Sequence, residues 1–86
     1  MLIELKSNAE EDLEFFSKKD PQKLEKIFSL IADIQKNPNS GLGKPEKLKH
    51  NLNGCWSRRI DRSNRLVYRI EGNKIVILNC RYHYSK

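Results

Sequence analysis

Apolar and polar residues alternate with two different periods along this chain, one helical and one strand-like. Helical spacing is clearest where apolar residues recur at steps of three and four, the pattern of one helix face: Leu24, Ile27, Phe28, Ile31 and Ile34. Asp20-Pro21 is a strong helix start, with Asp as N-cap and Pro in the first turn. Asn37-Pro38 ends the helix, because proline disfavours helical backbone at the residue before it. We expect this stripe to lie in the core.

A shorter helix is expected just before it. Ser7-Asn8-Ala9-Glu10 fits a capping box, in which the Ser7 hydroxyl and the Glu10 carboxylate satisfy free N–H groups of the first turn. Apolar residues then form a stripe on this helix: Ala9, Leu13 and Phe16, broadened by Phe15. Two helices joined by a few residues make an αα-hairpin. Ahead of them, the partly alternating residues 2–5 predict a strand at or near a sheet edge.

Three strands are expected over 55–60, 65–70 and 75–82, with turns at 61–64 and 71–74. Short turns of this kind predict an antiparallel meander. A tightly closed first hairpin would pair Ile60 with Arg65 and Arg58 with Val67. Alternation then places two sets of residues on opposite faces. One face would carry Trp56, Arg58, Arg65, Val67 and Arg69, and the helix-packed face Leu66, Tyr68 and Ile70.

The last strand extends the same scheme. If Val76, Leu78, Cys80 and Tyr82 pack on the helices, Arg81 and His83 share the open face with Arg58 and Arg65. A slip of one residue would reverse this assignment. The expected fold is α+β, with an N-terminal strand and an αα-hairpin packed on one face of an antiparallel β-sheet. We expect residues 1–86 to form one domain.

The stretch 37–54 lacks either period, and long loops in small domains are usually functional or disordered. Three leucines, Leu42, Leu48 and Leu52, can pin it to the body, so we expect an ordered loop. It carries four cationic or titratable residues around a single carboxylate, Glu46: Lys44, Lys47, Lys49 and His50. The plainer interpretation is that Glu46 only balances its lysines in solvent.

Charge is distributed unevenly. The net charge is +6, with six Lys/Arg and eight Asp/Glu in residues 1–43 but eleven and three in residues 44–86. That asymmetry indicates a polyanionic or acidic partner for the second half. Cys55 and Cys80 are expected to be reduced and buried, with no zinc-ligand spacing. No signal peptide and no apolar run of membrane-spanning length is found, so a cytoplasmic location is expected.

Glu, His, Tyr and Arg on a basic face suit RNA cleavage without a metal. The RNA supplies its own nucleophile, the 2′-OH, so the protein needs only to move two protons and neutralise the phosphorane. Trp56 or Tyr84 would stack on bases of a single strand. A solvent-exposed His83 and a core Trp56 are the plainer alternatives.

Four blocks of sequence carry a family resemblance: GKPEKLKHNL at 43–52, WSRRI at 56–60, RLVY at 65–68 and CRYHY at 80–84. Together they closely resemble the Txe/YoeB family of toxins of bacterial type II toxin–antitoxin systems, within the RelE/ParE fold group. The resemblance implies an endoribonuclease that cuts translated mRNA in the ribosomal A site, with 2′,3′-cyclic or 3′-phosphate and 5′-OH products. It implies no cofactor or metal.

The resemblance also implies roles for particular residues. Glu46 matches the proposed general base, His83 the general acid, Arg65 the phosphate-stabilising cation and Tyr84 an orienting phenol. Lys49, His50 and Arg59 match secondary RNA or 16S rRNA contacts, although our strand pairing puts Arg59 on the face opposite Arg65. The charge pattern adds four further candidates for RNA or ribosome contact: Lys44, Lys47, Arg58 and Arg81.

The implied partners are mRNA, the 70S ribosome and a cognate antitoxin whose C-terminal segment wraps the toxin, with no membrane contact. Family members are commonly homodimers, which the sequence neither supports nor excludes. Ser85 and Lys86 extend past Tyr84, and Cys55 stands where an aromatic residue is usual. The competing hypotheses are a toxin of the same fold that blocks its target without cleavage, and a non-toxic RNA-binding regulator.

Overall fold

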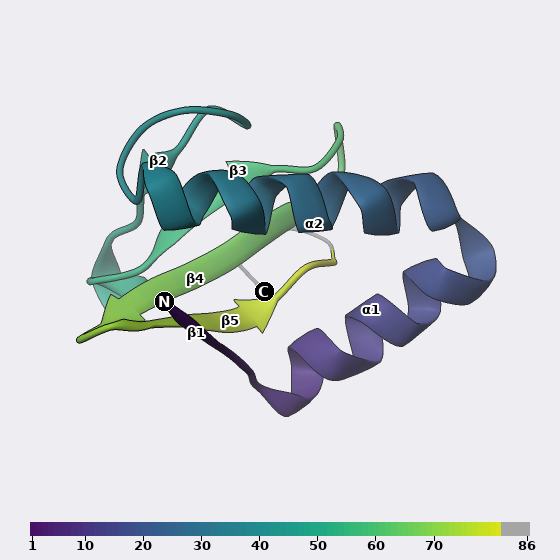
Figure 1. The fold of residues 1–86 in the computed structure, drawn as a ribbon, viewed down its shortest axis with the longest axis horizontal. Helices are drawn as coiled ribbons and strands as arrows, with labels where there is room; N and C mark the ends of the chain where they lie inside the picture. Colours follow the sequence, from purple (N-terminus) through teal and green to yellow (C-terminus); the bar gives the residue numbers. More distant parts are fainter. Residues whose placement is uncertain (82–86) are drawn as a thin grey trace.

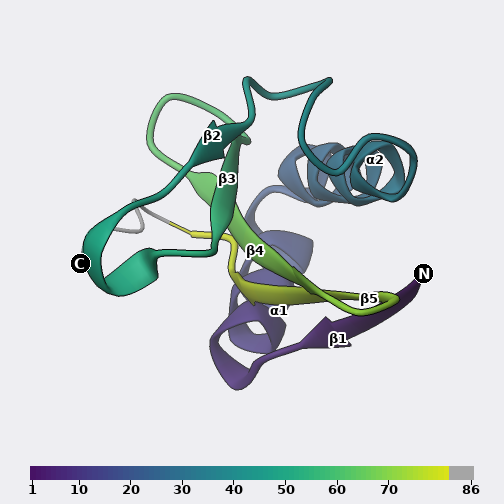
Figure 2. The ribbon, with the colours of Figure 1, turned by 90° about the vertical axis from the view of Figure 1, so that its left-hand side faces the viewer.

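The computed structural model describes residues 1–81 as a two-layer α+β fold. Its elements are β1 (Leu2–Leu5), α1 (Ser7–Lys19), α2 (Pro21–Lys36), β2 (Glu46–Lys47), a short 3₁₀ helix η1 (His50–Leu52), β3 (Trp56–Arg59), β4 (Arg65–Glu71) and β5 (Lys74–Asn79). The sheet order is β1-β5-β4-β3-β2, with β1 parallel to β5 and every other pair antiparallel. Both helices lie on one side of this mixed sheet (Figures 1 and 2). Within residues 1–81, neither helix is long and apolar enough to span a membrane.

Helix α2 has the predicted ends, with Asp20 as N-cap, Pro21 in the first turn and Asn37 as C-cap. Its buried residues are Ile27, Leu30, Ile31 and Ile34. The inclusion of Phe28 in this stripe is wrong, because its side chain is 53% exposed. At about 100° per residue, the four buried residues fall within one arc of about 100°, and Phe28 lies about 60° beyond its edge.

Helix α1 begins differently from the prediction, and the capping box is wrong. The N-cap is Lys6, Ser7 is already helical, and no side chain caps this end. The Lys6 N–H donates to the Ile77 carbonyl of β5 at 3.0 Å, so the β1–β5 pairing continues to the residue before the helix. Ser7 therefore lies inside the helix, where its hydroxyl cannot reach the first-turn N–H groups as an N-cap would.

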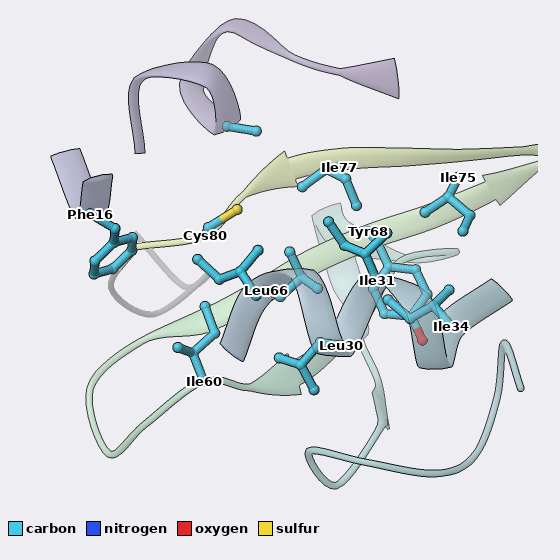
Figure 3. Packing of buried hydrophobic residues seen from close by; sticks show 12 residues of the cluster. Phe16, Leu30, Ile31, Ile34, Ile60, Leu66, Tyr68, Ile75, Ile77 and Cys80 are labelled. Atoms are coloured by element: carbon cyan, nitrogen blue, oxygen red, sulfur yellow. The ribbon is translucent and has the colours of Figure 1, made fainter. Parts of the chain in front are cut away.

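The main core lies between the helices and the sheet. Phe16 of α1 and Leu30, Ile31 and Ile34 of α2 face side chains that project from the strands (Figure 3). The strands contribute Leu66, Tyr68, Ile75 and Ile77 to this layer, and Ile60 and Cys80 join it just beyond the ends of β3 and β5. Full burial of one such aliphatic side chain contributes roughly 1.5–3 kcal/mol, so this layer supplies most of the driving force for folding.

A second, smaller cluster covers part of the other face of the sheet. Leu48, Cys55 and Val67 are buried in it, with Leu52 and Leu78 packed alongside. Leu48 and Leu52 thus pin the loop as expected, whereas Leu42 is exposed and does not. Cys55 fills a core position within this cluster, which explains its burial as a free thiol.

The register of the first hairpin differs by one residue from the prediction. Arg59 pairs with Arg65, Arg58 with Leu66 and Ser57 with Val67. The cause is the turn, because the Asp61 carboxylate accepts the N–H groups of Ser63 and Asn64 at 2.8 Å, and Ile60 bonds to Asn64 instead of Arg65. The slip exchanges the two faces of β3.

A bulge in β5 changes the last strand as well. Val67 pairs with Asn79 but Tyr68 pairs with Ile77, which leaves Leu78 as the extra residue. Ile75 and Ile77 face the helices because they pair with Ile70 and Tyr68, so the expectation that Val76 and Leu78 pack there is wrong. The bulge shifts the alternation after Leu78, so Cys80 does join the main core. The strand ends at Asn79, earlier than predicted.

Candidate active site

Three residues from three neighbouring strands meet on the sheet face that points away from the helices, here called the open face. Glu46 of β2 is paired with Ser57 of β3. Arg65 of β4 directs Nη1 to within 3.3 Å of Glu46 Oε1 and 3.2 Å of Ser57 Oγ. Ser57 is fully buried, the Arg65 side chain is 14% exposed and the Glu46 side chain is 52% exposed. The guanidinium is therefore held from below by a hydroxyl, while the carboxylate stays accessible to solvent.

Such an arrangement has a defined chemical capacity. A solvent-accessible carboxylate can accept a proton from a bound hydroxyl. A guanidinium fixed beside it can neutralise negative charge that develops on a phosphate. Because Arg65 is already oriented by two acceptors, little side-chain entropy is lost when it binds an anion.

The loop that presents Glu46 is held in place by Arg58. Arg58 is fully buried, and each of its five N–H donors is used. Nε donates to Tyr68 Oη at 3.3 Å, and Nη1 to the Asp33 carboxylate and to the Leu42 carbonyl. Nη2 donates to the carbonyls of Asn37 and Ser40. This set of bonds, the Arg58 network, ties the loop after α2 to the middle of the sheet.

Gly43 carries the chain from the Arg58 network to β2. Its φ is +79°, and a Cβ there would lie 2.9 Å from Leu30 Cδ2 and 3.2 Å from Arg58 Cβ. Its carbonyl accepts the Arg59 N–H, and the Leu48 N–H bonds to the Cys55 carbonyl at 2.9 Å on the other side of Glu46. A residue with a side chain at Gly43 would push the loop outward and move Glu46.

Electrostatics also favour the Arg58 network. The Arg58 guanidinium and the Leu42 N–H hold the pKa of the Asp33 carboxyl below its ordinary value. Burial raises the pKa of Tyr68, whose hydroxyl donates to the Pro38 carbonyl at 2.7 Å. Both groups therefore keep their usual protonation states at neutral pH. Each pKa is shifted away from 7, whereas a general acid or base needs a pKa near the working pH.

Five of the predicted RNA-binding residues are exposed: Lys44, Lys47, Lys49, His50 and Arg59. Arg59 lies opposite Arg65, so our placement of it on the other face is wrong. Lys47 is paired with Trp56 and alternates with Glu46, which directs its side chain to the helix side of the sheet. Glu46, Lys49 and His50 line a hollow of about 260 Å³ with the intervening residues.

Three predictions about the open face are wrong. Arg58 is buried on the helix side, and its donors are all occupied by the protein. Trp56 is partly buried against the main core, so it offers no stacking platform on the open face. The Arg81 guanidinium lies over the Phe15 ring of α1, with Cζ 3.5 Å from the ring centroid.

His83 and Tyr84 lie outside the described residues, so their expected roles stay predictions. Ser57 is the residue that sequence reasoning missed. Strand alternation in the correct register places Ser57 on one face with Glu46 and Arg65. The predicted register was wrong by one residue, and it placed Ser57 on the opposite face.

Comparison with known proteins identifies the family of this chain. Residues 5–84 match the model of the YoeB-like toxin of bacterial type II toxin–antitoxin systems. Toxin YoeB of Streptomyces coelicolor is 45% identical over 84 residues, which cover 98% of this chain and all of the relative.

Two solved structures share the whole fold. A YoeB/ParE toxin from Agrobacterium tumefaciens has a TM-score of 0.95 at 40% identity and covers 98% of this chain and 100% of its own. A heterotetrameric YoeB–YefM toxin–antitoxin complex from Staphylococcus aureus has a TM-score of 0.90 at 44% identity, with 98% and 99% covered. This chain therefore belongs to the YoeB-like toxins of bacterial type II toxin–antitoxin systems.

Proposed function

We propose that this toxin is a ribosome-dependent endoribonuclease that cuts translated mRNA in the A site and so stops translation. One observation carries the proposal: a solvent-accessible Glu46 carboxylate beside the Arg65 guanidinium, which is fixed over buried Ser57. A protein that only blocks its target has no need of a carboxylate held beside a pre-oriented cation on a basic surface.

In the proposed reaction, Glu46 takes the proton of the RNA 2′-OH, and that oxygen attacks the adjacent phosphorus. The bond from phosphorus to the 5′-oxygen breaks, which leaves a 2′,3′-cyclic phosphate and a 5′-OH. His83 supplies the proton to the departing oxygen, and Tyr84 orients the substrate. Arg65 neutralises the extra charge of the phosphorane. The substrate provides the nucleophile, so the residues need no metal ion or organic cofactor.

The contact between Glu46 and Arg65 gives the site a switch-like step on substrate binding. A phosphate that enters the open face competes for the Arg65 N–H groups. Once Arg65 turns to the phosphate, the Glu46 carboxylate is released from its ion pair. It is then free to accept the hydrogen bond of the RNA 2′-OH.

Binding to the ribosome is assigned to the exposed cations around this site. Lys44, Lys49, His50 and Arg59 surround Glu46 or share its face, and they suit phosphates of mRNA and 16S rRNA. Lys47 can contact RNA only from the sheet edge. Arg58 is left out of this assignment because it is buried.

The proposed protein partner is a cognate antitoxin, as in the YoeB–YefM complex of S. aureus. An acidic antitoxin segment would be steered by the excess of Lys and Arg in residues 44–86. A heterotetramer is compatible with two toxin copies, so we also propose a homodimer.

The test is primer extension on a defined message in a translating extract. Wild-type toxin should produce cuts within codons only when ribosomes translate the message, and addition of antitoxin should abolish them. Growth arrest without such cuts would favour a toxin that blocks its target without cleavage. Normal growth on induction without antitoxin would favour a non-toxic RNA-binding regulator.

A further inference from the structure

The chain leaves the sheet at Cys80 and contacts α1 instead of continuing along β4. β5 ends at Asn79, just after the bulge at Leu78. The Cys80 N–H then donates to Asp12 Oδ2 at 2.8 Å, a hydrogen bond between residues 68 positions apart. A hydrogen bond from a backbone N–H to a carboxylate is stronger than one between two neutral backbone groups.

A second contact with α1 follows one residue later. Arg81 Cζ lies 3.5 Å from the centroid of the Phe15 ring, a stacked cation–π contact. The Phe15 ring is itself held edge-on by Phe16, with centroids 5.5 Å apart and planes at 75°. Phe16 is buried in the same core cluster as Cys80. Consecutive residues of the chain are thus fixed to consecutive turns of one helix.

The Cys80 side chain supports the same picture. It is fully buried in the main core. Burial, together with the negative charge of Asp12, raises the pKa of the Cys80 thiol to about 12. The Asp12 carboxylate therefore lies close to both the backbone and the side chain of Cys80. The hydrogen bond described between the two residues is donated by the Cys80 N–H.

We propose that Asp12 and Phe15 are positioning residues for the catalytic end of the chain, which hold the C-terminal segment that carries His83 and Tyr84. The inference rests on the proposed function, because it assigns importance to those two residues. Neither Asp12 nor Phe15 touches the open face, so their effect on cleavage passes through residues 80 and 81.

The two contacts fix the backbone of Cys80 and the side chain of Arg81 on α1. When both are lost, the last residue fixed by the sheet is Asn79. A displacement of 1 Å in a catalytic group can cost roughly 100-fold in rate, so loss of these contacts should slow cleavage markedly.

The test compares two measurements on purified toxin: amide exchange at Cys80, and single-turnover cleavage on saturating programmed ribosomes. Asp12→Ala removes the acceptor, and Phe15→Leu removes the ring but keeps an apolar side chain. Asp12→Asn and Phe15→Tyr are the conservative variants. Glu11→Ala, at an exposed neighbouring position of α1, is the matched control.

We expect Asp12→Ala to exchange the Cys80 amide at least 10-fold faster and to cleave roughly 10- to 100-fold more slowly, with unchanged ribosome affinity. Phe15→Leu should slow cleavage less than Asp12→Ala does. Phe15→Tyr, which keeps an aromatic ring under Arg81, should cleave at the wild-type rate. Asp12→Asn should be intermediate, since its amide oxygen can still accept the Cys80 N–H. Glu11→Ala should match wild type in both measurements.

Faster Cys80 exchange with cleavage within twofold of Glu11→Ala would overturn the proposal, because the anchor would then be structural only. Unchanged exchange in Asp12→Ala would overturn it as well. If Asp12→Ala fails to fold, Asp12→Asn and Phe15→Leu decide the question. If wild type itself does not cut, the proposed function fails, and the exchange data still show whether α1 fixes residue 80.

Discussion

Glu46 and Arg65 meet across an intervening strand, with 3.3 Å between Oε1 and Nη1. β3 separates the two strands that carry them, and its Ser57 hydroxyl fills the space below the ion pair. An exposed ion pair of this kind adds little to stability, so its geometry matters more for function than for folding.

The first prediction concerns Ser57. Ser57→Ala removes an acceptor that orients Arg65 and should slow cleavage about 10-fold, the value of one hydrogen bond to a charged group. Single-turnover rates on saturating ribosomes measure this. Ser63→Ala, in the exposed turn between β3 and β4, is the control and should cleave at the wild-type rate. Equal rates for the two variants would show that Ser57 does not orient Arg65.

The second prediction concerns the Arg58 network. Arg58→Ala leaves Asp33 and three backbone carbonyls without their donor and should lower the free energy of unfolding by about 3–5 kcal/mol. Arg59→Ala, one residue along and exposed, should change it by less than about 0.5 kcal/mol. Urea unfolding of the two variants provides the comparison. Similar losses for both would mean that the network does not hold the loop.

A pH dependence follows from Asp33. Its pKa is depressed in the folded protein, chiefly by the hydrogen bond from Arg58. A carboxyl group whose pKa is depressed by folding stabilises the protein at any pH above its pKa in the unfolded chain, about 3.9 for Asp. That contribution disappears as the pH falls through the pKa of the folded protein. Wild type should therefore exceed Asp33→Asn in stability at pH 7, and the difference should shrink below pH 4. A difference that stays constant from pH 7 to pH 3 would contradict this account.

Cys80 gives a prediction at the alkaline end. Because its pKa in the folded protein is about 12, the thiol is neutral at pH 8 and should not react with a thiol reagent until the chain unfolds. Its contribution to stability is complete below the ordinary pKa of 9.0 and is lost as the pH rises toward 12. Labelling of a Cys55→Ala variant, with and without urea, follows Cys80 alone. Rapid labelling of the folded protein would contradict the burial of Cys80.

Much of the fold could be predicted from the chain. The ends of α2 follow from Asp20-Pro21 and Asn37-Pro38, and the antiparallel meander of β3, β4 and β5 follows from alternation and turns. The strand β2 lies in the stretch predicted as a loop, and β1 runs parallel to β5 in a sheet that was predicted to be antiparallel. What failed was register. The Asp61 side chain closes the first turn one residue earlier than assumed, and the bulge at Leu78 interrupts the alternation of β5. The turn is a local motif, in which an Asp side chain bonds to the backbone two and three residues on, and the prediction overlooked it. The bulge depends on how β5 pairs with β4, which the local sequence of β5 does not encode.

The same errors limited the site. Glu46 and Arg65 were predicted as base and cation, and the structure brings their side chains together, while their catalytic roles stay predictions. A register slip put Arg58 on the open face and hid Ser57 behind the sheet. Nothing in the local sequence of Arg58 distinguishes it from Arg59, because the acceptors that define its role, the Asp33 carboxylate and three loop carbonyls, lie 16 to 25 residues away.

The central claim is that Glu46 and Arg65 form the catalytic centre of a ribosome-dependent nuclease. The most direct measurement is the single-turnover rate of mRNA cleavage on saturating programmed ribosomes for Glu46→Ala and Arg65→Ala. Matched controls are Glu25→Ala on the exposed side of α2 and Arg62→Ala in the turn before β4.

Glu46→Ala and Arg65→Ala, like His83→Ala, should each lower that rate by roughly 10²- to 10⁴-fold, while both controls cleave as wild type. Near-wild-type cleavage by Glu46→Ala and Arg65→Ala, with bound toxin confirmed on the ribosome, would contradict the assignment of the catalytic centre to this pair.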